Sequence, residues 1–256
     1  MIIIFNKLIY SYKNKGFFKT IFVVFFFFRN LLKKIFFLII ILNKNVEERF
    51  TIIYKKKLWG KNLESVSGPG SSLKYTNNLR KELPNIFHKF NIKSILDAPC
   101  GDFNWMRKMK KIMNDFKISY IGGDIVKELV DKNNLIYSKK NISFLYLDIR
   151  FSVLPDADLM ICRDCLFHFS FNDAFLFLNN FLRSNIKYLL TSNHINRNKF
   201  KNKDITTGDF KLIDLFSSPY NFPRQKLYSI KDYNLPEPEK EMVFFSRDQL
   251  KNFIKS

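Results

Sequence analysis

The sequence predicts an α/β fold in which helices cover a mostly parallel, doubly wound sheet with an antiparallel edge strand. Four short apolar runs indicate buried strands, and each ends in charged residues, at Asp97, Asp124, Asp148 and Arg163-Asp164. Segments with apolar residues at helical spacing separate the runs, as expected for strands joined by crossover helices. A late apolar segment, 241–246, predicts the antiparallel strand. Because parallel strands end at one sheet edge, the charged residues should gather there.

The turn after the first run is typical of a strand–turn–helix unit that holds a nucleotide-like ligand. Pro99 and Gly101 lie in this turn, where a residue without a side chain lets backbone amides approach a ligand closely. Asn104 fits the N-cap of a helix predicted over 105–113. A dinucleotide fingerprint has several glycines and this turn has only Gly101, so the turn alone is weak evidence.

The later strand ends add to this evidence. Asp124 lies 27 positions after Asp97, close to the spacing of an acid that accepts hydrogen bonds from ribose hydroxyls. His168 follows the fourth strand, and a histidine at a sheet edge can act as a base near neutral pH or orient a substrate hydroxyl. His194, after a fifth strand predicted over 187–191, is the second choice for that role.

Several ordered motifs resemble class I S-adenosylmethionine-dependent methyltransferases. They are LDAPCGDFNWM (residues 96–106), YIGGDIV (120–126), ICRDCLFH (161–168) and KYLLTS (187–192). More narrowly, the set is similar to a largely uncharacterised bacterial subgroup of these enzymes, and the resemblance covers about 59–246. The turn departs from the general pattern, because Pro99, Asp102 and Phe103 stand at or near positions that are usually small or glycine.

The resemblance implies a Rossmann-like class I methyltransferase fold with S-adenosyl-L-methionine as cofactor. The cofactor-binding residues it implies are Asp97, Pro99 and Gly101 for the methionine portion, Asp124 for the ribose, and Asp148 with Ile149 for the adenine. The candidates for orienting the acceptor or removing its proton are Arg163, Asp164 and His168. No metal is expected in the site.

Two further segments are expected to cover the site. A turn-rich loop at 68–70 precedes a helix predicted over 76–87, from which Thr76 or Arg80 would either meet the cofactor carboxylate or form a surface cap without ligand contact. The long polar stretch 196–224 predicts an acceptor lid, because long loops inside compact domains are usually functional. Its Tyr220 and Phe222 suit stacking on a planar or sugar face.

The amino-terminal part of the chain differs in composition from the rest. Residues 1–45 are apolar and rich in phenylalanine, with basic residues that fall largely in one sector of a helical wheel. They predict a helix lying in a membrane interface, with a tilted membrane span or a helix packed on the protein's own core as alternatives. Residues 46–57 are interpreted as a charged linker, and 58–256 as the catalytic domain.

Composition restricts the partners. The chain has 256 residues and a formal net charge of +20, but its lysines are scattered, so a generic basic surface is favoured over specific nucleic-acid binding. The three cysteines, Cys100, Cys162 and Cys165, form no even disulfide framework, and core thiols are favoured over a zinc site. A cytoplasmic protein, peripheral or anchored at the inner face of the membrane, is expected.

The function predicted from these observations is methyl transfer from S-adenosylmethionine to a small-molecule or glycan-linked acceptor, at a hydroxyl. One alternative is a nucleotide-sugar or NAD-dependent enzyme, since Asp124 suits either ribose, although a turn with one glycine argues against pyrophosphate. The other is a catalytically degenerate, Rossmann-like binding protein tethered to the membrane surface. Fold alone does not choose an acceptor.

Overall fold

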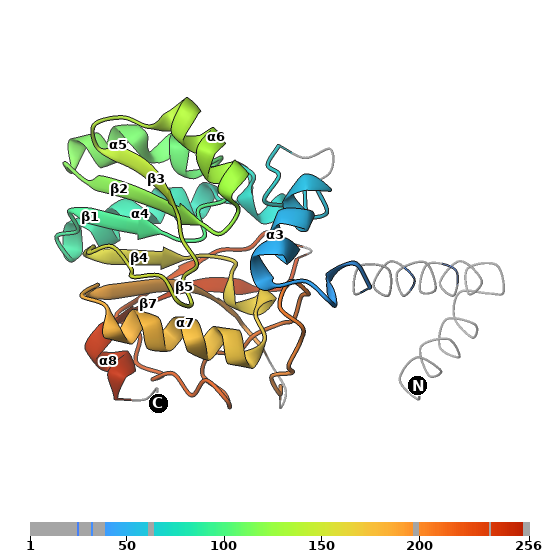
Figure 1. Cartoon of the computed structure of the whole chain (residues 1–256). Coiled ribbons are helices and arrows are strands. Elements are labelled where there is room, and N and C mark those ends of the chain that lie inside the picture. Colours follow the sequence, from blue (N-terminus) through green and yellow to red (C-terminus); the bar gives the residue numbers. More distant parts are fainter. Residues whose placement is uncertain are drawn as a thin grey trace. The chain divides into compact units, whose positions relative to one another are not determined.

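The computed structural model describes residues 39–60, 64–196, 200–235 and 237–252, together with the single positions 25 and 32. The chain divides into two units, residues 1–45 and 46–256, and the fold below is that of the second unit (Figure 1). The predicted interfacial segment falls mostly outside the described residues. Within the described ranges, no helix is long and apolar enough to cross a membrane.

A seven-stranded sheet forms the centre of the second unit, with strand order β3-β2-β1-β4-β5-β7-β6. All pairs from β3 to β5 are parallel, whereas β7 runs antiparallel to both of its neighbours. This confirms the predicted mostly parallel, doubly wound sheet. The strands are β1 (Ser94–Asp97), β2 (Ser119–Asp124), β3 (Ile142–Tyr146), β4 (Leu159–Cys162), β5 (Tyr188–His194), β6 (Tyr228–Lys231) and β7 (Lys240–Ser246).

The antiparallel part of the sheet contains one strand more than the sequence predicts. The segment expected as the edge strand is β7, and it pairs with β5 from Tyr188↔Ser246 to His194↔Lys240. The short strand β6 lies outside it and forms the edge. Only Ile230 of β6 is buried, so its sequence carries little of the apolar signal that identifies a strand.

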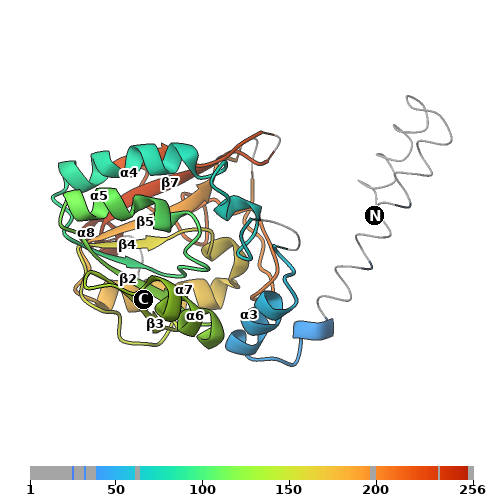
Figure 2. The ribbon, with the colours of Figure 1, turned by 90° about the horizontal axis from the view of Figure 1, so that it is seen from above.

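Helices cover both faces of the sheet (Figure 2). Along β1 and β5, alternate residues point to opposite faces: Ile95 and Leu190 pack in the core beneath α4 and α5, and Leu96 and Leu189 in the core beneath α7 and α8. The helices are α3 (Val46–Lys55), α4 (Asn77–Lys89), α5 (Lys110–Asp115), α6 (Lys127–Tyr137), α7 (Phe171–Arg183) and α8 (Arg247–Lys251), with short 3₁₀ turns η1 (Pro69–Ser71), η2 (Met106–Met109) and η3 (Leu166–His168).

The helix predicted over 105–113 is divided. It starts as the 3₁₀ turn η2 and continues as α5 to Asp115. Asn104 is not its cap, because the Oδ1 that would accept from the helix backbone accepts instead from Arg107 Nη2 (3.0 Å). Its Nδ2 donates to the Glu64 carboxylate (2.7 Å) and to the Ser71 carbonyl (3.0 Å). Asn104 thereby ties the segment before the sheet to the turn after β1.

The sequence predicts that residues 46–57 are a charged linker, but most of them form a helix of the second unit. Val46 to Lys55 form α3, with Glu47 and Glu48 in the first turn, where the helix dipole favours acids. Val46, Phe50, Ile53 and Tyr54 recur at helical spacing and line the pocket described below. The Lys55–Lys57 run obscured this apolar stripe.

The topology fixes where a ligand can bind. Connections from β1 lead to β2 and β3 on one side, whereas β4 and β5 lie on the other. At such a reversal the loops leave the strand ends in opposite directions and open a crevice at the carboxyl edge. Asp97 pairs with Gly122 of β2 and Ile161 of β4, so the end of β1 lies at this reversal.

Candidate active site

A pocket lies at the carboxyl edge of the sheet, bounded by the strand ends, α3 and the segment 66–71. It brings together the nine residues assigned above to the cofactor and the acceptor, but not His194, the second choice for the base. The nine are Asp97, Pro99, Gly101, Asp124, Asp148, Ile149, Arg163, Asp164 and His168. Most of the remaining lining is apolar or aromatic, so the pocket combines a hydrophobic wall with a few polar groups, as ligand sites commonly do.

The turn after β1 closes on the end of β2. Asp124 is 6% exposed, and its carboxylate accepts hydrogen bonds from the backbone N–H groups of Gly101 and Val126, both at 3.0 Å. Gly101 has a φ of 54°, and a Cβ there would lie 2.3 Å from Ser67 Oγ. A side chain at this position would therefore push the covering segment off the turn. Burial raises the pKa of Asp124 to about 6.

Asp97 is the second buried acid of the pocket. The hydroxyl of Tyr120 donates to its Oδ2 at 2.7 Å. Burial raises the pKa of Asp97 to about 7, despite the opposing effects of the Tyr120 hydrogen bond and the Arg163 charge. Neither Asp97 nor Asp124 takes part in an ion pair in the described part of the chain.

Asp102, one of the departures from the family pattern, fastens the covering segment to the turn. Its carboxylate accepts hydrogen bonds from the Ser65 hydroxyl and the Val66 N–H group, each at 2.9 Å. Its own N–H group donates to Ser67 Oγ at 3.1 Å. Phe103, another departure, is fully buried against aromatic rings. These two residues therefore support the turn from outside the pocket.

Asp148, at the end of the third apolar run, is already engaged. Arg150 donates to both of its carboxylate oxygens, from Nε at 2.9 Å and from Nη2 at 2.7 Å, and also pairs with Asp173 at 2.6 Å. The neighbouring Ile149 is buried and lines the pocket. This part of the pocket therefore presents the apolar surface of Ile149 and an acid, Asp148, that is already paired with Arg150.

A buried ion network lies behind the pocket and includes Arg163 and Asp164. Arg163 pairs with both oxygens of Asp232, at 2.8 and 3.0 Å, and donates to the Gly70 carbonyl at 2.8 Å. Lys240 pairs with Asp164 and also lies 3.2 Å from Asp232. Burial would raise the pKa of Asp164, but Arg163 and Lys240 hold it well below its usual value. A guanidinium with these partners stays charged and cannot remove a proton.

His168 is held in one tautomer beside this network. Its Nδ1 lies 2.8 Å from the carbonyl oxygen of Asp209. A carbonyl only accepts hydrogen bonds, so Nδ1 carries the proton and Nε2 keeps its lone pair. The ring stacks on Trp59 with centroids 4.3 Å apart. Burial lowers the pKa of His168 to about 4, so the imidazole is neutral at physiological pH.

The expected acceptor lid has a different role in the structure. Tyr220 and Phe222 are 1% and 3% exposed and pack in the core, so the prediction that they stack on the acceptor is wrong. The ring of Tyr220 packs on those of Phe171 and Phe175 of α7, so it is not available to a ligand. Arg80 donates to the Leu73 carbonyl, and neither Arg80 nor Thr76 lines the pocket.

Sequence reasoning missed several residues of the site. Phe50 and Trp59 belong to the pocket lining, and Phe50 packs on both Trp59 and Phe169. Helical spacing in 46–54 was the available signal for this wall. Asp232 and Lys240 had no local signal, because they reach Arg163 and Asp164 from 69 and 76 positions away.

Comparisons with known proteins show likeness in fold. The methyltransferase domain of bacterial CtHen1-C shares 14% identity over 47% of this chain and 66% of its own, with a TM-score of 0.41. Human N-acetylserotonin methyltransferase in complex with SAM shares 19% over 62% of this chain and 44% of its own, with a TM-score of 0.42. Magnesium protoporphyrin IX methyltransferase from Synechocystis PCC 6803 with bound SAH shares 10% over 68% and 84%, with a TM-score of 0.49.

These identities are low, and the likeness concerns the fold alone. The chain spans less than half of the human enzyme and just under two thirds of the CtHen1 domain. No protein-family model matches the sequence, and no curated protein matches it. The strand order confirms the predicted α/β, Rossmann-like fold, whereas the narrower subgroup stays a prediction.

Proposed function

We propose that this protein transfers the methyl group of S-adenosylmethionine to a hydroxyl of a small-molecule or glycan-linked acceptor. One observation carries the proposal: two buried carboxyl groups, Asp97 and Asp124, line a largely apolar pocket in a chain of net charge +20. Neither has an ion-pair partner among the residues that the structure describes. A basic protein that keeps acids unpaired in its main pocket is suited to a cationic ligand with an apolar portion.

The same lining argues against the nucleotide-sugar and NAD alternatives. Those ligands carry a pyrophosphate, which requires glycine-rich backbone or cationic side chains at the strand end. Among the described residues that line the pocket, Arg163 is the one basic side chain that stays charged, and Asp232 and Asp164 already pair with it. The two acids are better suited to a cationic sulfonium compound with a ribose than to a ligand with a negatively charged pyrophosphate.

The residues of the pocket fit the cofactor's chemistry. When bound, S-adenosylmethionine supplies a sulfonium whose methyl group is already activated for transfer. Asp124 has carboxylate lone pairs for ribose hydroxyls in addition to the two amides it accepts. Asp97 is placed to accept from the cationic amino group, and Ile149 offers apolar surface to the adenine.

The acceptor end of the pocket is aromatic. Trp59, Phe50 and Phe169 surround His168 there. Aromatic faces bind planar groups and the apolar faces of sugars. Nε2 of His168, with its free lone pair, accepts the acceptor hydroxyl's proton as the oxygen takes the methyl group. Alignment of the two reactants supplies most of the catalysis.

Affinity for S-adenosylmethionine should rise by about tenfold or more between pH 5.5 and pH 8. The pKa values of Asp97 and Asp124 are about 7 and about 6, so both carboxyls are largely protonated at the lower pH and ionised at the higher one. A cation binds the ionised forms, so its binding strengthens as pH rises through these values. Isothermal titration calorimetry across this range measures the effect.

S-adenosylhomocysteine keeps the amino group and the ribose assigned to Asp97 and Asp124, so its affinity should rise with pH to a similar extent. Asp97→Asn should flatten the S-adenosylmethionine profile, provided that the variant melts cooperatively. An affinity for S-adenosylmethionine that does not change with pH would show that these acids do not face the cofactor.

A further inference from the structure

Exposed apolar side chains gather around the mouth of the pocket. They are Leu58 after α3, Ile195 after β5, Phe210 in the loop between β5 and β6, and Leu235 between β6 and β7, with exposures of 43%, 39%, 50% and 80%. Single exposed apolar residues are common on protein surfaces. Here three different loops carry them to the same edge of one sheet.

The contacts of these loops place two of them against His168 and join the other to its neighbour. Phe210 packs on the rings of His168 and His194, with centroids 5.9 and 6.1 Å apart. Trp59, next to Leu58, stacks on the same imidazole. The N–H group of Ile195 donates to the carbonyl of Glu239 at 2.8 Å, which joins its loop to the loop that holds Leu235.

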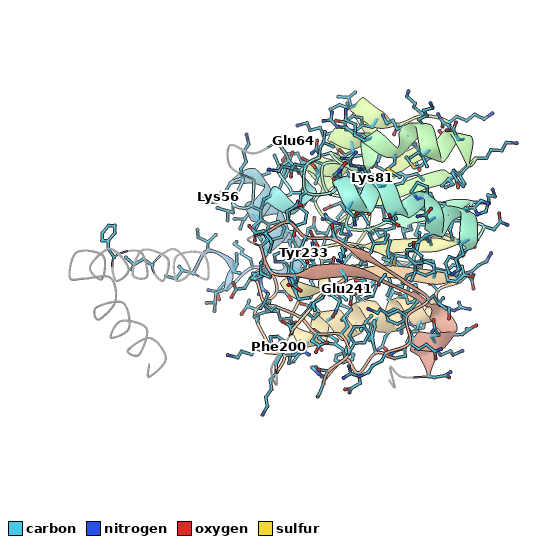
Figure 3. The ribbon with its side chains drawn as sticks, turned by 180° about the vertical axis from the view of Figure 1, so that it is seen from behind. Lys56, Glu64, Lys81, Phe200, Tyr233 and Glu241 are labelled. Atoms are coloured by element: carbon cyan, nitrogen blue, oxygen red, sulfur yellow. The ribbon has the colours of Figure 1, made fainter. Side chains whose placement is uncertain are left out.

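These loops and the end of β6 expose basic side chains, namely Lys56, Lys57, Lys201, Lys203 and Lys231. The exposed acids among them are Glu64, Asp204 and Glu237. The carboxylate of Asp204 is already engaged, because its Oδ1 accepts hydrogen bonds from the N–H groups of Phe171 and Ile205. Lys56, Phe200 and Tyr233 lie toward this edge in Figure 3. The edge therefore combines apolar side chains with an excess of lysine.

We propose that this edge rests on an anionic lipid surface and that the acceptor is a lipid-anchored molecule whose hydroxyl-bearing headgroup enters the pocket. This inference rests on the proposed function and names its class of acceptor. Aromatic and aliphatic side chains mixed with lysines are suited to the interface of an anionic bilayer. In the sequence, the apolar, basic segment 1–45 directly precedes Val46, which lines the pocket.

The opposite edge of the sheet offers a matched control. Leu135 is 88% exposed near the end of α6. The crossover helix α6 runs back between the parallel strands β2 and β3, so it ends toward their amino ends, away from the pocket. Leu135 and Leu235 are thus two highly exposed leucines at opposite edges.

The test places one fluorophore on the full-length chain, through Leu235→Cys or Leu135→Cys. The three native cysteines are buried, so labelling favours the introduced thiol. Vesicles of phosphatidylcholine and phosphatidylglycerol, with or without brominated acyl chains, report contact by quenching. The label at position 235 should be quenched at least about twofold more than the label at 135. Vesicles of phosphatidylcholine alone should bind more weakly.

Two results would overturn the inference. If the chain binds vesicles but neither label is quenched, only residues 1–45 contact the lipid. If both labels are quenched equally, the pocket edge has no preferred orientation toward it. Titration of the same labelled proteins with S-adenosylhomocysteine separates this test from the proposed function. Binding without quenching at 235 rejects the lipid-facing edge alone, whereas absence of binding rejects the methyltransferase proposal.

Discussion

Replacing His168 with alanine should lower methyl-transfer turnover about 100-fold and change the affinity for S-adenosylhomocysteine by no more than about threefold. The hydrogen bond to the Asp209 carbonyl fixes the proton on Nδ1, so the lone pair available to the acceptor hydroxyl is that of Nε2. Alanine removes that lone pair and the ring that stacks on Trp59. The measurement is single-turnover methyl transfer with the acceptor saturating, alongside calorimetry with S-adenosylhomocysteine.

The matched control is His88→Ala, because His88 is an exposed histidine on α4, away from the pocket. This variant should retain parental turnover. The low pKa of His168, about 4, also predicts that His168 causes no loss of activity between pH 6 and pH 8, since the ring is neutral throughout. Parental turnover in a folded His168→Ala protein would remove the residue from the reaction. Loss of the cooperative melt would assign it a structural role instead.

Replacing Asp232 with alanine should lower the free energy of unfolding by about 3–5 kcal/mol. The carboxylate of Asp232 is fully buried and pairs with Arg163 and Lys240. Without it, two buried cations share the single carboxylate of Asp164, and the desolvation of the unpaired charge is no longer compensated. Urea denaturation followed by circular dichroism measures the change.

An exposed ion pair provides the comparison. Lys55 and Glu128 lie 3.2 Å apart, with side chains 60% and 58% exposed. Solvent screens such a pair, so Lys55→Ala should cost less than about 1 kcal/mol. If Asp232→Ala costs as little as Lys55→Ala, the network contributes nothing to stability, and Arg163 is free for another role.

The parallel part of the fold could be predicted because its signals are local. The strands β1, β2 and β4 are apolar runs whose ends carry Asp97, Asp124 and Arg163, and hydrogen bonding along a parallel sheet brings those ends together. All nine candidate residues therefore reach one pocket, although they come from four separate segments. Right-handed crossovers between parallel strands bring those four segments to the same edge of the sheet.

The parts that escaped prediction depend on distant contacts. Asp232 is identified as the partner of Arg163, and Lys240 as the partner of Asp164, only when β6 and β7 are placed beside β5. The aromatic residues of the predicted lid show the reverse error. Tyr220 is suited by its chemistry to stack on a ligand, but α7 presents Phe171 and Phe175 to it and buries it in the core. Sequence pattern does not distinguish these two uses of an aromatic ring.

The helix α3 shows how a strong local feature can mask a weaker one. The Lys55–Lys57 run indicates a solvated segment, whereas Phe50 and Ile53, one helical turn earlier, face the protein. Four apolar residues at helical spacing were present, but charged neighbours lowered the mean hydropathy of the stretch. One wall of the pocket was consequently assigned to a linker.

Calorimetric titration of the full-length chain with S-adenosylhomocysteine, and separately with NAD, tests the central claim most directly. S-adenosylhomocysteine should bind, and NAD should give no heat above dilution. Asp124→Ala should weaken S-adenosylhomocysteine by about 1–3 kcal/mol, because ribose hydroxyls lose a charged acceptor. NAD binding in place of S-adenosylhomocysteine, or parental affinity in a folded Asp124→Ala protein, would contradict the assignment of this pocket to S-adenosylmethionine.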